Sequence, residues 1–163
     1  MTVTQPPKPM PPVRPTHIAR FERLFRVAVG VDIDKEDLRH YEGFLDVKVA
    51  DLLRRACEVA QDSGRKVILP HDLPITKGLA KCIDDFRTID TEEQLGLAPV
   101  LENLGKRPQF DLSYDDEVYA QLPYIIGGMT VALARSFKVI DPDVVSIVTV
   151  HWLRVFQLFD LVW

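Results

Sequence analysis

The sequence predicts an all-α protein made of two similar halves, each with a long central helix. Apolar residues recur at three- and four-residue steps from residue 34 to residue 63, which is typical of one face of an amphipathic helix. A similar pattern runs from residue 113 to about residue 139. The segment KVILP at Lys66–Pro70 returns as KVIDP at Lys138–Pro142, with the same offset at every matched position. Because both segments follow a long helical pattern, they indicate an internal duplication.

Residues 1–15 are predicted to form a separate, flexible arm. They contain six prolines, a density that disfavours both helix and sheet. Residues 1–31 also carry five basic side chains and one glutamate, a net charge of +4. Because the whole chain has a net charge of −4, residues 32–163 have a net charge of −8. Two interpretations stay open: the arm meets an anionic partner first, or it is a solvated tail. The acidic total argues against a protein that coats DNA by bulk charge.

Residues 16–90 are expected to form the first half. Thr16 is predicted to be the N-cap of a short helix that ends at Gly30. The long helix starts at Asp34, and the brief apolar stretch after Lys66 is long enough for a bridge strand. A third helix is expected from Asp72 to the region of residue 90. The predicted order is therefore short helix, long helix, short extended segment and medium helix.

Residues 91–163 repeat this order less regularly. Thr91 is expected to open a short helix, and Ser113 with Asp116 resembles a capping box for the second long helix. Pro123 should kink that helix. The last helix, Pro142–Trp163, is apolar on almost every side, which predicts burial between the halves or a surface for a protein partner or self-association. Arg154 near its centre argues against a membrane span.

Specific motifs resemble histone folds. Residues 63–73, SGRKVILPHDL, are similar to the second loop of archaeal histones. The stretches Phe21–Arg26, Asp72–Leu79 and Ile126–Gly128 resemble an uncharacterised bacterial family of tandem histone-fold proteins. The resemblance implies two histone folds in tandem, 16–90 and 91–163, paired as an intramolecular pseudodimer behind the arm 1–15.

The resemblance also implies a structural clamp in which the loop arginine, Arg65, pairs with Asp72 at the start of the last helix of the first half. The second half departs from this pattern, because the offset that relates the two repeated segments places Phe137 at the position equivalent to Arg65. The arginine–aspartate clamp is therefore expected in the first half of the chain and not in the second.

Five basic residues are the nucleic-acid candidates. Arg65 and Lys66 lie in the loop where histones touch phosphate, and Arg14, Arg20 and Lys35 could extend the track. Acidic residues oppose phosphate binding at these loops. Asp32 and Asp34 flank the loop before the first long helix, and Asp141 and Asp143 lie in the loop after the second long helix. One hypothesis is a histone-like architectural protein that binds DNA weakly, through two to four phosphates and with a salt slope of about −2 to −4. The alternative is a histone-fold module for protein–protein interaction with no nucleic-acid role.

Catalytic, metal and cofactor sites are not expected. The histidines at 17, 40, 71 and 151 share no ligand spacing, and no nucleotide-binding or hydrolase motif occurs. The pair Gly127-Gly128 lies within the second long helix and indicates a close helix crossing, not a phosphate-binding loop. Cys57 and Cys82 are expected to be reduced core thiols. The proline-rich start does not resemble a signal peptide, which predicts a cytoplasmic protein, with the nucleoid as one location. The expected protein is a non-enzymatic one.

Overall fold

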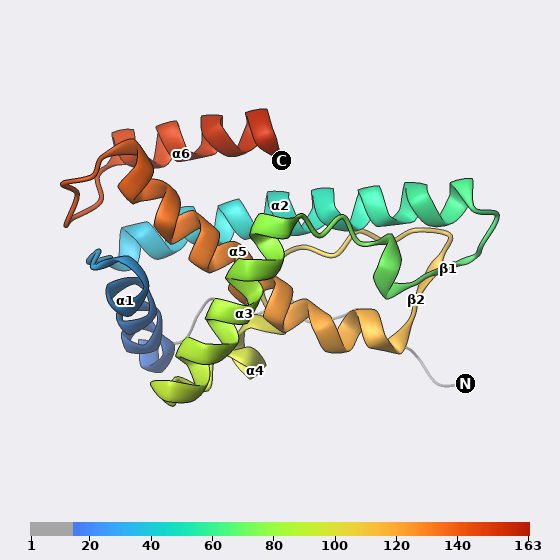
Figure 1. The fold of residues 1–163 in the computed structure, drawn as a ribbon, viewed down its shortest axis with the longest axis horizontal. Coiled ribbons are helices and arrows are strands. Elements are labelled where there is room, and N and C mark those ends of the chain that lie inside the picture. Colours follow the sequence, from blue (N-terminus) through green and yellow to red (C-terminus); the bar gives the residue numbers. More distant parts are fainter. Residues whose placement is uncertain (1–14) are drawn as a thin grey trace, which may run out of the picture.

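A computed structural model describes residues 15–163 and is mostly helical, so the all-α prediction is confirmed. The elements run in the following order (Figure 1): α1 Pro15–Val29, α2 Lys35–Asp62, β1 Val67–Ile68, a 3₁₀ turn Pro70–Asp72, α3 Lys77–Glu92, α4 Ala98–Leu101, β2 Ser113–Tyr114, α5 Asp116–Ile140 and α6 Thr149–Val162. The two long helices, α2 and α5, fall where the apolar periodicity predicts them.

Local side chains fix the ends of the long helices. Asp34 caps α2 by accepting from the Asp37 amide at 3.0 Å, and the Asp37 carboxylate accepts from the Asp34 amide in return. Gly64 follows the last turn with a φ of +72°, a left-handed conformation that glycine adopts without strain. Asp115 caps α5 through the Glu117 amide. The prediction that Ser113 starts this helix is wrong, because Ser113 lies in β2.

The predicted boundaries of four other helices also differ from the structure. Helix α3 begins at Lys77, where Thr76 caps it, and it continues through Thr91, the residue that the sequence predicts to open the next helix. The predicted short helix of the second half shrinks to the single turn α4, because Gln94 and Gly96 adopt positive φ values and interrupt the helix. Helix α6 begins at Thr149, after an irregular segment that follows α5. Helix α1 starts at Pro15, so Thr16 is inside it.

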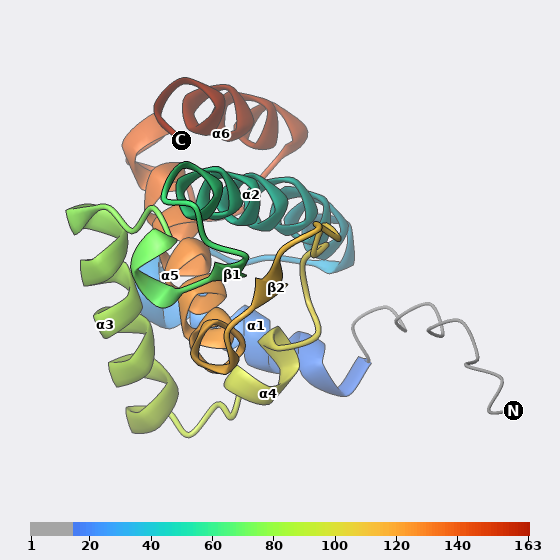
Figure 2. The same ribbon diagram turned by 90° about the vertical axis from the view of Figure 1, so that its right-hand side faces the viewer.

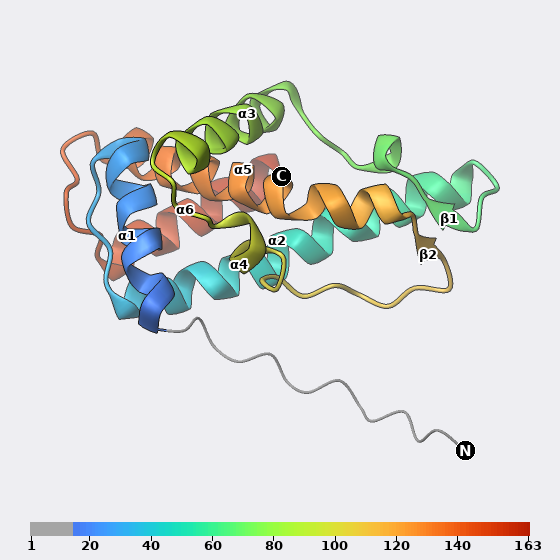
Figure 3. The same cartoon turned by 90° about the horizontal axis from the view of Figure 1, so that it is seen from below.

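The two long helices cross near their centres, and the other helices pack around this crossing (Figures 1 and 3). Helix α3 approaches α5 closely at two adjacent glycines. A β-carbon on Gly127 would collide with the Phe86 ring, and one on Gly128 would collide with Ile83. The sequence prediction of a close helix crossing at this glycine pair is therefore confirmed.

Short parallel bridges join the parts of the chain that precede and follow the long helices. β1, after α2, pairs with β2, before α5, in the register Val67 with Ser113. Asp32, before α2, pairs with Ser146, after α5. Each bridge therefore joins the entrance of one long helix to the exit of the other. The two bridges lie at opposite ends of α2.

The core is continuous between the first and second halves of the sequence. It includes Phe21, Tyr41 and Phe86 from the first half and Ile126, Phe137 and Trp152 from the second. Inside it, the Tyr41 and Thr130 hydroxyls lie 2.6 Å apart, and the Trp152 indole donates to Asp37 at 2.8 Å. Burial raises the pKa of the Asp37 carboxyl, although the bond from Trp152 opposes that shift. Residues 16–90 and 91–163 thus share one hydrophobic core.

Helix α6 lies along α2, on the opposite side of the long helices from α1 and α4 (Figures 1 and 2). Trp152, Val155 and Phe159 face the core and are buried. Leu153 and Leu161 face away and are 56% and 83% exposed. The expectation that this helix is buried between the halves is therefore wrong for its outward face. No helix within residues 15–163 is both long and apolar enough to cross a membrane.

Candidate nucleic-acid interface

The loop after α2 brings Arg65 and Asp72 together. The guanidinium donates to both carboxylate oxygens, at 2.6 and 2.5 Å, and also to the Val67 carbonyl at 3.2 Å. Asp72 accepts a further bond from the Leu69 amide at 2.8 Å, and its side chain is fully buried. The hydrogen bond from Arg65 lowers the pKa of Asp72 to about 2. Arg65 is therefore engaged in holding the loop to the 3₁₀ turn.

Lys66, next to this pair, is exposed, and its ammonium group makes no ion pair with any residue of 15–163. Its carbonyl accepts from the Ser113 amide at 3.1 Å, which fixes the backbone beside the β1–β2 bridge. The side chain is thus held at a rigid backbone position while its charge faces solvent. Of the two loop residues singled out from the sequence, Lys66 is the one available to a phosphate.

The structure does not bring the remaining candidates to this loop. Lys35 is exposed at the first position of α2, and the 28 residues of that helix span about 42 Å. Arg20 lies on α1 and donates to the Gly96 carbonyl at 3.4 Å. Arg14 lies outside the described residues. The five candidates therefore form no single cluster within the part of the chain that the structure describes.

Several of the opposing carboxylates are occupied in local structure. Asp32 pairs with Arg26 at 3.1 Å, Asp34 caps α2, and Asp141 lies 3.0 Å from His151. Asp115 caps α5 close to β2. These acidic side chains sit at both bridged ends. Acidic groups at these positions disfavour an anionic partner at either end.

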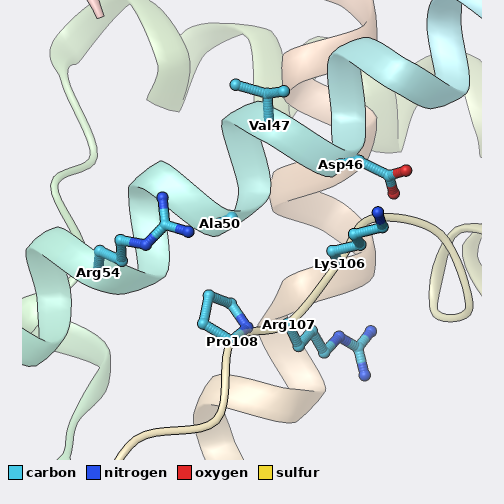
Figure 4. A pocket seen from close by; sticks show the side chains of 7 residues that line it. All are labelled: Asp46, Val47, Ala50, Arg54, Lys106, Arg107 and Pro108. Atoms are coloured by element: carbon cyan, nitrogen blue, oxygen red, sulfur yellow. The ribbon is translucent and has the colours of Figure 1, made fainter.

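A further basic feature lies between α2 and the segment that leads to β2. This surface hollow of about 510 Å³ is lined by Asp46, Val47, Ala50, Arg54, Lys106, Arg107 and Pro108. Arg54 and Lys106 stand on opposite walls, with Pro108 between them, whereas the Arg107 side chain runs away from α2 (Figure 4). Arg54 pairs with Asp51 at 3.3 Å, and Lys106 makes no ion pair within residues 15–163. The hollow carries more positive than negative charge.

The segment 105–108 is held tightly against α2. Gly105 has a φ of +81°, and a β-carbon there would lie 2.8 Å from Val49. The Arg107 guanidinium donates to the Glu102 carbonyl. The sequence contains one signal for this hollow, the adjacent pair Lys106-Arg107 after a glycine, but sequence reasoning did not assign these residues.

Potential metal ligands and thiols are dispersed in the described part of the chain. No group of three or more histidine, cysteine or acidic side chains capable of holding a metal occurs among residues 15–163. Cys57 and Cys82 are both buried and free, and burial raises the pKa of the Cys57 thiol. The candidate interface therefore consists of exposed cations on a rigid helical frame.

Comparisons with known proteins give the following matches. A family model described as a domain of unknown function (DUF1931) matches residues 21–160. An uncharacterised protein of Aquifex aeolicus is 33% identical over 137 residues, covering 79% of this chain and 81% of that protein. A crystal structure from Thermus thermophilus has a TM-score of 0.79 and 42% identity, covering 90% of this chain and 97% of that one. A crystal structure from Aquifex aeolicus, at 22% identity and a TM-score of 0.75, covers 93% of this chain and 98% of that one and shares the fold.

Proposed function

The chain belongs to the family described as a domain of unknown function (DUF1931), and from its own geometry we propose that it is a histone-like architectural protein. In this proposal, residues 16–90 and 91–163 are two histone folds that pair within one polypeptide and bind nucleic acid weakly. The supporting observation is the reciprocal pair of bridges, β1 with β2 and Asp32 with Ser146. Two similar units related by an approximate two-fold axis exchange contacts in this reciprocal way.

The separation of the exposed lysines suits a duplex better than a single bound phosphate. Lys35 is the first residue of α2 and Lys66 lies in the loop after its last residue, so a helix about 42 Å long lies between them. One turn of B-form DNA is about 34–36 Å. The two ends of α2 therefore match phosphates of a DNA duplex slightly more than one turn apart. Lys106 adds a cation at the hollow beside α2. Phosphate contacts of this kind position a protein on DNA without reading its sequence.

The affinity expected from these groups is modest. Two to four phosphate contacts predict a slope of about −2 to −4 in a plot of log K against log salt concentration. The body of the protein is acidic, which lowers binding further. Binding to short duplex DNA is thus expected at low salt and should be lost near physiological salt.

Titration of a fluorescent 30-base-pair duplex at 20 and 150 mM salt tests this proposal. The variant Lys66→Glu/Lys106→Glu should weaken binding at 20 mM salt at least tenfold, because each change replaces an attraction with a repulsion. Lys77→Glu/Lys81→Glu, two exposed lysines on α3, is the matched control for net charge. Absence of a salt-dependent shift at 100 μM protein would exclude the proposal, and equal losses in both variants would exclude the proposed surface.

A second candidate function is a protein-interaction module without a nucleic-acid role. The observation that favours it is the outward face of α6, where Leu153 and Leu161 are exposed although neighbouring residues on the same helix are fully buried. Exposed apolar rows of this kind mark interaction surfaces. The expected cytoplasmic location is common to both candidates and stays a prediction.

A further inference from the structure

Helix α6 presents a row of side chains that stay exposed on the surface formed by residues 15–163. Val150, Leu153, Gln157 and Leu161 follow one another at steps of three and four, so they share one face of the helix. Val150 is 47% exposed, Leu153 56% and Leu161 83%. Gln157 is exposed at the centre of this row. We call these four residues the α6 face.

The opposite side of α6 is firmly anchored, so this exposure does not come from a loosely docked helix. The Trp152 indole bonds to the buried Asp37, and the Trp152 ring packs edge-on against Phe137 with centroids 4.9 Å apart. Near the other end, Asp160 accepts from the buried Lys48 at 2.8 Å. The α6 face is therefore a fixed apolar surface, as an interaction site requires.

The charges on α6 restrict the kind of partner. The helix carries one cation, Arg154, and one anion, Asp160, so its formal charge is zero. Helices that lie on membrane surfaces carry an excess of lysine and arginine, and so do surfaces that bind nucleic acid. A neutral apolar face with one charge of each sign suits a protein surface of the same composition.

The α6 face is also self-complementary in its spacing. Leu153 and Leu161 each lie four positions from Gln157, and Arg154 and Asp160 each lie three positions from it. In an antiparallel pair of α6 helices with a two-fold axis at Gln157, each leucine is level with a leucine of the second copy. Arg154 makes no ion pair within residues 15–163. In this arrangement it is level with Asp160 of the second copy, whose side chain is 70% exposed.

We propose that two copies of this chain associate through the α6 face, antiparallel and with the two-fold axis at Gln157. This proposal deepens the second candidate function and does not depend on nucleic-acid binding. The lysines of the proposed nucleic-acid surface, Lys35, Lys66 and Lys106, are not part of α6, which lies on the opposite side of the long helices from α1 and α4 (Figures 1 and 2). The two proposals therefore succeed or fail separately.

The size of the face sets the expected affinity. A helix of 14 residues is about 21 Å long and about 10–12 Å wide, so two such helices bury less than the ~800 Å² per partner of a stable complex. The dimer should accordingly be weak, with a dissociation constant of about 10–100 μM. Concentrations well above and below this range are needed to see both states.

Sedimentation velocity on the full chain from 5 to 500 μM tests the association. Wild type should change from monomer to dimer over this range. Leu153→Glu/Leu161→Glu should weaken association at least tenfold, because it places four carboxylates in one apolar seam. The matched control is Val27→Glu/Tyr119→Glu, which adds the same charge on α1 and α5 and should dimerise like wild type. A wild-type chain that stays monomeric at 500 μM overturns the proposal.

A cross-link at the axis tests the geometry without disturbing the fold. Gln157→Cys places one exposed thiol at the proposed two-fold axis, and the native Cys57 and Cys82 are buried. Under mild oxidation at 50 μM it should form a disulfide-linked dimer at least ten times faster than Gln61→Cys, an exposed position on α2 beyond α6. Equal rates would overturn the two-fold arrangement. Binding of monomeric wild type to phosphatidylcholine vesicles, lost in Leu153→Glu/Leu161→Glu, would likewise overturn it in favour of a lipid surface.

Discussion

The two bridged ends of the molecule use similar backbone contacts but different side chains. At the β1–β2 end, Arg65 binds Asp72 through two hydrogen bonds, and Asp72 accepts from the Leu69 amide. At the other end, His151 accepts from the Val148 amide through Nδ1 at 3.0 Å, and its Nε2 lies 3.0 Å from Asp141. Because an amide donates to Nδ1, the proton is on Nε2, and the imidazole donates to Asp141.

Arg65 and Asp72 are thus joined by two hydrogen bonds between charged groups, whereas His151 and Asp141 are joined by one hydrogen bond from the imidazole. The Asp72 carboxylate is fully buried, whereas the Asp141 side chain is 41% exposed. Removing one partner of this pair is costly, because the other charge and the Leu69 amide lose the acceptor that they share. A hydrogen bond at a solvated carboxylate is replaced by water at little cost. The β1–β2 end should therefore depend much more strongly on its side chains than the other end does.

Asp72→Ala is the variant with the largest expected effect on this comparison. It leaves Arg65 and the Leu69 amide without their acceptor, so the free energy of unfolding should fall by about 3 kcal/mol. Urea unfolding followed by circular dichroism at pH 7 measures this loss. Asp141→Ala is the matched change at the other end and should cost about 1 kcal/mol. Equal losses for the two variants would contradict the asymmetry.

Acid should weaken the β1–β2 end in a defined window. The pKa of Asp72 is held at about 2, below its usual value of 3.8, mainly by the hydrogen bond from Arg65. Since the folded pKa is the lower one, this stabilisation is fully present above about pH 4 and is lost as the pH falls from about 4 to about 2. The difference is worth about 2 kcal/mol at pH 7.

Urea unfolding of wild type and Asp72→Asn at pH 7, 5, 3 and 2 measures this contribution. The wild-type advantage over Asp72→Asn should persist from pH 7 to pH 5 and shrink below pH 4. The Asp141 carboxyl also has a lowered pKa, through the hydrogen bond from His151, so Asp141→Asn provides the parallel series. A wild-type advantage that stays constant down to pH 2 would show that the charge of Asp72 is not what stabilises this end.

Patterns that depend on neighbours in the sequence predicted much of this molecule. The long helices follow from apolar periodicity and from caps such as Asp34, and Gly127-Gly128 indicated a close crossing that Phe86 and Ile83 provide. The absence of an arginine at position 137 also had a visible consequence. Phe137 is buried there against Trp152, so an apolar contact occupies the region of the missing clamp.

Features that depend on distant contacts were not predictable in this way. Leu95 and Leu97 suggested a helix, but they are buried from irregular backbone, and Asp90 accepts from the Leu97 amide at 2.9 Å. The basic hollow requires α2 to meet Lys106, which is separated from it along the chain by β1, α3 and α4. The apolar residues of α6 look alike in the sequence, and the packing of this helix against α2 and α5 decides which of them are exposed.

His151→Leu tests the weaker end and should have the smallest effect. The leucine keeps most of the side-chain volume but leaves the Val148 amide and Asp141 without the imidazole. Water can replace the bond at Asp141, so the free energy of unfolding should fall by about 1 kcal/mol. His71→Leu is the matched control, since this histidine is 70% exposed and lies 3.7 Å from Asp72, and it should cost less than about 0.5 kcal/mol. A loss of about 3 kcal/mol or more in His151→Leu, as large as that of Asp72→Ala, would mean that the neutral imidazole holds its end as strongly as the arginine holds the other.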